Sequence, residues 1–160
     1  MTKLLLSLHV LAAILAIGPV TVAASMFPRK ARAALAVEGA DQADAAASVR
    51  ILYRVTQVYA MLGIAVPVLG IGTAQMMGVM GSPWLITSLV LTVLAALILL
   101  VLVLPRQEAV VSALAGAEDA DSTKALSGLK LLTMSTGMFS LLWAAVTVLM
   151  VFRPGSTTHA

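Results

Sequence analysis

The sequence predicts an all-α fold, a four-helix transmembrane bundle made of two tandem helical hairpins with cytoplasmic helical extensions. Of its 160 residues, 61% are hydrophobic and 11% are charged, which is more apolar surface than a water-soluble domain of this size can bury. Four apolar stretches without Asp, Glu, Lys or Arg reach the roughly 20 residues that a helix needs to cross a bilayer. They are Leu4–Phe27, Val55–Met80, Trp84–Leu104 and Leu131–Phe152. Most of the lysines and arginines lie in the two longer connections between these stretches.

The first stretch carries His9, the only titratable side chain expected inside the bundle. At 100° per residue, one side of this helix holds His9 and small residues, and the other holds bulky aliphatic residues. The small side comprises Ala12, Ala13, Ala16, Val20, Ala23 and Ala24, and the bulky side comprises Leu4, Leu8, Leu11, Ile14, Leu15, Val22 and Met26. Small residues let helix backbones approach closely in lipid. We therefore expect the alanine side, and His9 with it, to face a partner helix.

A cleaved signal peptide is the competing interpretation of this stretch, because small residues at Val22, Ala23 and Ala24 could form a cleavage site. The basic residues Arg29 and Lys30 follow directly, and the positive-inside rule disfavours their translocation. We interpret the stretch as a retained transmembrane helix.

The basic residues predict the orientation of the chain. The two longer connections hold Arg29, Lys30, Arg32, Arg50, Arg54, Arg106, Lys124 and Lys130, against Lys3 and Arg153 elsewhere. By the positive-inside rule both connections are cytoplasmic. The sequence thus predicts a multi-pass protein of the inner (plasma) membrane with both termini, and the turn at residues 81–83, outside.

Both cytoplasmic connections have helix-forming sequences after a Pro-Arg pair. Gly39 and Gly116 can each end a helix, and the following helices can be capped by Asp41 and by Asp119 or Asp121. These features recur at an offset of 77 residues: Pro28, Arg29, Gly39 and Asp44 align with Pro105, Arg106, Gly116 and Asp121. We interpret residues 1–160 as one domain with an internal repeat, 3–80 and 84–153, related by an axis along the membrane normal.

The second stretch has the strongest packing signal, a row of small residues that should make it the central helix. The row comprises Thr56, Tyr59, Ala60, Gly63, Pro67, Gly70, Ala74, Gly78 and Gly81. A kink is expected near Pro67. The fourth stretch has a milder row of Thr133, Gly137, Ser140, Ala144 and Thr147. The third is almost wholly Leu, Val and Ile, which predicts that it is the most lipid-exposed.

His9 is the one candidate for cofactor chemistry. A neutral imidazole suits haem iron or copper, and methionines that end the second and fourth stretches are expected at the same depth. They are Met76, Met77, Met80 and Met150. The structural alternative is that His9 donates a hydrogen bond to a hydroxyl or backbone carbonyl while the methionines fill space. A pH-sensitive or ligand-binding histidine is a further alternative.

The pattern of His9, the Gly-Pro pair nine residues later and the Arg after IGPVTVAASMFP resembles a family of small bacterial four-helix predicted integral membrane proteins with a domain of unknown function. That family is distantly similar to the copper-resistance D and HemJ-like membrane proteins. In those proteins a histidine of the N-terminal helix is associated with haem or copper, and by this resemblance only His9 could take such a role. The other histidine, His159, lies in the polar tail, so bis-histidine ligation is not available.

The function expected from these features is that of a non-enzymatic accessory or scaffolding subunit of a larger membrane complex, without a catalytic or metal site and without a cofactor. Its expected partners are membrane lipid and other integral membrane subunits or a second copy, not nucleic acid. The first alternative is a membrane redox protein that binds haem b or copper through His9. The second is a small channel or carrier, although no buried charge marks a path and Gln57 and Gln75 lie about five turns apart.

Overall fold

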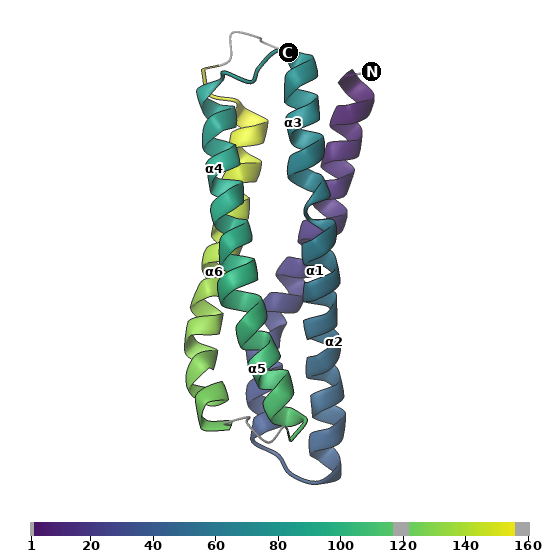
Figure 1. Ribbon diagram of the computed structural model, residues 1–160, viewed down its shortest axis with the longest axis vertical. Helices are drawn as coiled ribbons and strands as arrows, with labels where there is room; N and C mark the ends of the chain where they lie inside the picture. The colour runs from purple at the N-terminus through teal and green to yellow at the C-terminus, as the bar shows by residue number, and fades with distance from the viewer. Residues whose placement is uncertain (1, 117–121, 156–160) are drawn as a thin grey trace.

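The computed structural model describes residues 2–116 and 122–155, which form helices and short connections without any strand (Figure 1). The helices are α1 (Thr2–Leu35), α2 (Ala40–Leu62), α3 (Ala65–Met77), α4 (Pro83–Leu97), the π-helix η1 (Ile98–Val103), α5 (Leu104–Leu114) and α6 (Ser122–Phe152). Four helical stretches are long and apolar enough to cross a membrane: Thr2–Leu35, Ala40–Met77, Pro83–Leu114 and Thr123–Phe152. The all-α class and the four predicted spans are confirmed.

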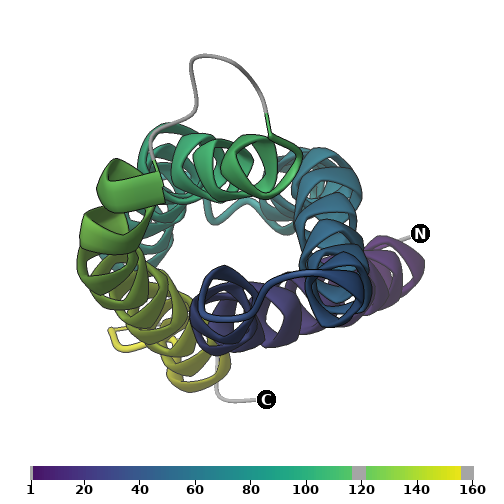
Figure 2. The same cartoon turned by 90° about the horizontal axis from the view of Figure 1, so that it is seen from below.

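The helices form two hairpins packed side by side. The first pairs α1 with α2 and α3, and the second pairs α4, η1 and α5 with α6 (Figure 1). The start of α1 and the end of α6 lie at one end of the bundle, here called the terminal end; the other is the loop end. Seen along its axis, the bundle is a ring of helices (Figure 2). The hairpins join through α1 with α6 and through α2 with α5, whereas α3 and α4 have few contacts with each other.

Helix α1 packs with the face that its sequence predicts. Ala16, Val20, Ala23 and Ala24 are buried, and all seven bulky aliphatic residues of the opposite side are exposed. The buried stripe continues beyond the predicted span through Ala31 and Ala34 at the loop end. Because α1 contacts α2, α3, α5 and α6, it is the central helix of the bundle.

The prediction that the second span is central is therefore wrong. In the 18-residue apolar stretch of this span 11% of the residues are buried, against 28% in the corresponding stretch of α1. Several of its glycines shape the backbone instead of packing against a neighbour: Gly63 lies at the break between α2 and α3, and Gly78, with φ of 69°, ends α3. Gly81 lies in the connection to α4. Only part of the predicted row, including Thr56 and Ala74, is buried.

Two further packing predictions are wrong. The third span is not the most exposed, because Ala95, Leu99 and Val103 belong to the core. In its apolar stretch 22% of the residues are buried, the same share as in α6. On α6, Thr133, Gly137 and Ala144 of the predicted small-residue row lie on the outer surface, whereas Ser140 is half-buried and Thr147 faces the cavity described below. The buried face carries larger residues, Leu129, Leu132, Phe139 and Val146 among them. Bulky side chains face inward here because they fill the space between the hairpins.

The prolines act differently in each span. Pro67 has no N–H to donate to the carbonyl of Gly63, and the helix breaks there: Val66 N bonds Gly63 O instead, at 3.1 Å. The predicted kink is thus confirmed. Helix α1 continues through Pro19 and Pro28. Pro105 directly follows the π-helix and Leu104, and the Arg106 side chain donates from Nη1 to Leu102 O at 2.7 Å.

The helical extensions at the loop end are present, with different caps from those predicted. Gly39, with φ of 70°, is the N-cap of α2 and does not end α1, which stops at Leu35. Asp41 lies inside the first turn of α2, where its charge favours the helix dipole. Gly116, with φ of 68°, follows the end of α5 as expected. The predicted caps Asp119 and Asp121 lie outside the described residues, and the internal repeat stays a prediction.

The apolar core occupies the loop half and the middle of the bundle. Its cluster comprises Val20, Ala24, Phe27, Ala31, Ala34, Val49, Ala95, Leu99, Val103, Val110, Ala125, Leu129, Leu132 and Phe139. On α1 this cluster begins only at Val20, and on α6 it ends at Phe139, where the ring meets Trp143 edge-on at 6.3 Å between centroids. The remaining terminal half of the bundle holds the candidate site.

Candidate functional site

His9 lies on the inner side of α1, half-buried against α3. Its Nδ1 atom is 3.0 Å from the backbone oxygen of Val66. The ring also lies directly over Gly70, where an added Cβ would come within 2.9 Å of the imidazole Cε1 atom. The imidazole therefore fits only because residue 70 has no side chain, and the expectation that His9 faces a partner helix is confirmed.

The contact with Val66 determines which nitrogen of His9 carries the proton. A carbonyl oxygen only accepts hydrogen bonds, so Nδ1 must be the donor. In the neutral imidazole Nε2 is then the acceptor. His9 thus makes the backbone hydrogen bond of the structural alternative and still has a nitrogen that can accept a proton or bind a metal.

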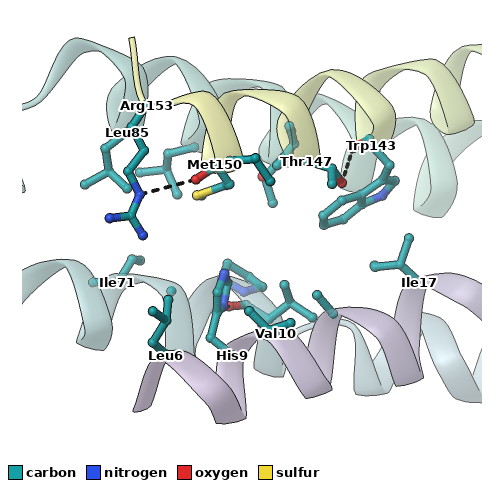
Figure 3. Close-up of a pocket in the computed structure, with 18 of the residues that line it drawn as sticks. Leu6, His9, Val10, Ile17, Ile71, Leu85, Trp143, Thr147, Met150 and Arg153 are labelled. Carbon is teal, nitrogen blue, oxygen red and sulfur yellow. Dashed lines mark hydrogen bonds between the residues drawn. The ribbon is translucent and has the colours of Figure 1, made fainter. Parts of the chain in front are cut away.

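His9 lies on the wall of a cavity of 1320 Å³ in the terminal half of the bundle. Figure 3 shows α1 and His9 on one side of this space and α6 on the other. All four spans contribute to the wall: residues 6–18 of α1, Val66–Ile71 of α3 with Met80, residues 85–92 of α4, and residues 143–155. The cavity exceeds the roughly 300–1,000 Å³ of ordinary small-molecule sites, so it is large enough for a sizeable ligand.

Arg153 provides the positive charge of the cavity. It follows the last residue of α6 and has φ of 43°, in the left-handed region that residues other than glycine rarely adopt. Its Nε atom donates to Met150 O at 3.3 Å, and its guanidinium carbon lies 5.6 Å from the ring centroid of the buried Trp84. In Figure 3 the side chain extends from α6 towards α1.

The other polar groups of the wall are mostly satisfied within their own helices. Thr92 and Thr147 donate their hydroxyl hydrogens to the carbonyls of Ser88 and Trp143, four residues earlier. Trp143 differs, because its buried Nε1 has no hydrogen-bond partner among the described residues. The cavity is thus an apolar space with two strong polar positions, His9 and Arg153.

The methionines predicted beside His9 separate in the structure. Met80 lines the cavity, as does Met150 of α6. Met76 is exposed and Met77 half-buried, and neither belongs to the wall. The two glutamines of the second span, Gln57 and Gln75, are exposed and lie away from it.

Some polar residues of interest were not identified by sequence reasoning. In the sequence Arg153 indicates only orientation, although its place between the last apolar residue of a span and Pro154-Gly155 is a signal for a residue that turns inward. Gln107 is fully buried at the loop end, and neither its Oε1 nor its Nε2 has a partner among the described residues. Nothing in the sequence around Gln107 distinguishes it from a solvated glutamine.

Among the described residues, no group of three or more His, Cys, Asp or Glu side chains could hold a metal ion. A group that takes a single imidazole ligand does fit the wall. Histidines that bind metals usually donate their other ring N–H to a carboxylate or backbone carbonyl, and His9 does so to Val66 O. The residues on this wall that could bind such a group are His9 through Nε2 and, as soft thioethers, Met80 or Met150.

Comparison with known proteins identifies the family but no characterised relative. The family described as "Predicted integral membrane protein (DUF2269)" matches residues 3–154, nearly the whole chain. The chain belongs to this family and is a multi-pass integral membrane protein. No curated protein and no solved structure matches it.

Proposed function

We propose that this member of the family of predicted integral membrane proteins DUF2269 is a non-enzymatic accessory or scaffolding subunit of a larger membrane assembly. The observation that carries the proposal is the outer face of α6. Three small residues of its row, Thr133, Gly137 and Ala144, would suit close helix packing and lie on the surface of the bundle. A partner helix, from another membrane protein or a second copy, would complete this packing.

The composition of this face supports a protein partner. Thr133 and Gly137, four residues apart, are both exposed, and a Cβ added at Gly137 would meet nothing within 4 Å. Met134 and Met138 lie beside them and are 61% and 56% exposed. Methionine side chains adapt to irregular partner surfaces, and small residues between them allow a second backbone to approach closely.

The test is the assembly state of the full chain, extracted from its native membrane in mild detergent and measured by native mass and pull-down. We expect the wild-type chain to be part of an assembly and Gly137→Leu to release it, because the leucine fills the approach path of the partner helix. Gly72→Leu is the matched control, since its Cβ would also stand in open space, but on α3. A free monomer for the wild type, or equal loss in both variants, would contradict the proposal.

A second candidate is a membrane redox protein that binds haem or copper, and the free Nε2 of His9 on the cavity wall favours it. When bound, such a group supplies a metal that carries one electron. The chain supplies the imidazole, oriented by Val66 O, and an apolar wall that limits access of water.

This candidate predicts a haem absorbance band or stoichiometric copper in protein purified from cells supplied with both. His9→Ala should remove the signal, and Met80→Leu should shift it if the thioether of Met80 is the second ligand. Met76→Leu is the control, because Met76 lies outside the wall. A colourless, copper-free preparation would rule out the redox protein.

A further inference from the structure

We propose that the terminal cavity binds an amphipathic ligand with an anionic head group, a phosphate or a carboxylate, held by Arg153, and an aliphatic body that fills the apolar space. This inference rests on the charge, depth and lateral boundary of the cavity. It does not depend on the association proposed for α6, and a test can separate the two.

The charge of the terminal end selects an anion. No Asp or Glu lines the cavity, and the acidic residues that the structure describes, Glu38, Asp41, Asp44 and Glu108, all lie at the loop end. Arg153 therefore has no carboxylate beside it on the wall. A positive charge next to an apolar space, without a counter-charge from the protein, favours a ligand that brings a negative charge.

The guanidinium of Arg153 has donors available for this ligand. Its one hydrogen bond to the described residues uses Nε, and the Trp84 ring stacks against one face. Both contacts orient the group, and Nη1 and Nη2 remain as a planar pair of donors. Such a fork matches two oxygens of a phosphate or carboxylate. The side chain of Arg153 is thus held in place with two hydrogen-bond donors ready for an anion, unlike a loosely solvated surface arginine.

The depth of the cavity matches an aliphatic chain in one leaflet. On α1 the wall runs from Leu6 to Gly18, which at 1.5 Å per residue is roughly 18 Å along the bundle. One leaflet of hydrocarbon is about 15 Å deep, half of a 30 Å core. A lipid with its head at Arg153 would therefore have its chain alongside Val10, Ile17 and Leu89, all on the wall.

The boundary between the hairpins offers this ligand a route from the bilayer. Residues of both α3 and α4 line the cavity, yet these two helices have few contacts with each other. The pairs α1 with α3 and α4 with α6 are well packed, whereas α1 and α6 lie on opposite sides of the cavity (Figure 3). A lipid can thus enter sideways between α3 and α4 without leaving the apolar phase.

The experiment is native mass spectrometry of the full chain in mild detergent with three probes at equal concentration: phosphatidylglycerol, oleate and phosphatidylcholine. We expect an anionic probe to be retained over phosphatidylcholine by about tenfold or more. Preference for phosphatidylglycerol identifies a phosphate head, and preference for oleate identifies a carboxylate. Equal retention of all three probes, or of none, overturns the proposal.

Variants locate the site. Arg153→Gln should reduce retention of the anionic probe by about tenfold, and Arg153→Lys, which keeps the charge but loses the planar pair of donors, should give an intermediate loss. Lys3→Gln removes the other cationic side chain near the terminal end without touching the wall, so it should change nothing. Retention unchanged in Arg153→Gln, or equally reduced in Lys3→Gln, overturns the assignment to Arg153.

A space-filling variant tests the cavity itself. Ala13 lies on the wall, so Ala13→Phe should reduce retention. Ala96→Phe adds the same volume on the exposed side of α4 and should leave retention unchanged. Thermal unfolding of each variant confirms that it is folded; loss in Ala96→Phe as large as in Ala13→Phe, with both folded, contradicts binding inside the cavity.

Discussion

At the scale of single residues, the pairing of His9 with Gly70 shows how a polar side chain is placed inside an apolar bundle. The cost of removing an imidazole from water is offset by the hydrogen bond to Val66 O. The close approach that makes this bond possible depends on the missing side chain of residue 70. The interaction thus belongs to a pair of helices, α1 and α3, and not to His9 alone.

A substitution series can measure this pairing. Gly72→Ala, on the same helix with open space around the new Cβ, should stabilise the protein by about 0.5–1 kcal/mol through helix propensity. Gly70→Ala should lack this gain and be about 1 kcal/mol less stable than Gly72→Ala, because the methyl group displaces the ring from Val66 O. Unfolding in detergent measures both.

The control for this series is the His9→Ala background. Without the imidazole, the methyl group at residue 70 has no ring to displace. The difference between Gly70→Ala and Gly72→Ala should therefore disappear. A difference that persists at full size would show that Gly70 is required for another reason.

Gln107 is the opposite case, a buried side-chain amide that has no hydrogen-bond partner in the part of the chain that the structure describes. An unsatisfied buried polar group costs about 1–3 kcal/mol. Gln107→Leu should therefore raise the free energy of unfolding by roughly that amount, measured by thermal unfolding in detergent. Gln75→Leu, at an exposed position of α3, is the control and should have little effect. Destabilisation by Gln107→Leu would indicate that the amide makes an interaction essential to the fold.

At the scale of secondary-structure elements, proline alone does not determine where a span bends. Helix α1 runs without interruption through Pro19 and Pro28, whereas the second span breaks ahead of Pro67. The difference lies in the preceding residues and packing. Gly63, whose carbonyl accepts from Val66 N instead of residue 67, has no side chain to pack against a neighbour, and its span is the least buried. By contrast, neighbouring helices pack against α1 along the buried stripe that includes Val20, Ala24 and Phe27.

Restoring the donor should therefore straighten the second span. In Pro67→Ala the N–H of residue 67 can bond Gly63 O, so α2 and α3 should join into one helix. The chain lacks cysteine, so spin labels at Ile51→Cys and Met76→Cys, both exposed, report one distance. In Pro67→Ala the distance between the two spin labels should lengthen towards roughly 37 Å, the value expected for an unbroken helix. Pro19→Ala should leave the distance unchanged, and no change in Pro67→Ala would place the cause of the break elsewhere.

At the scale of the whole molecule, the bundle is closed by an apolar core at the loop end and opens into a cavity at the terminal end. The charges follow the same division, since every acidic side chain of the described residues belongs to the loop end. By the positive-inside rule, the basic residues of the loop end are expected to set the orientation of the chain in the membrane. The orientation itself, with both termini outside, is a prediction from the basic residues.

Labelling of single cysteines in intact cells tests that orientation. Lys3→Cys, at the terminal end, should react with a membrane-impermeant thiol reagent, because the positive-inside rule places it outside. Ser48→Cys, exposed on the extension of α2, should react only after the cells are permeabilised. The reverse pattern would invert the orientation.

The sequence by itself determined the class of fold, the four spans and the buried face of α1, because the thickness of the bilayer sets helix length and helical periodicity assigns a side to each residue. The kink near Pro67 and the inward position of His9 followed from the same local rules. Which helix is central, which face of α6 is buried and which methionines accompany His9 were decided only by the tertiary structure. In lipid, small and large residues can each face a neighbour or the acyl chains, so inter-helix packing makes the choice. The cavity with Arg153 has the same origin, because it exists only where four helices separated in sequence fail to close on one another.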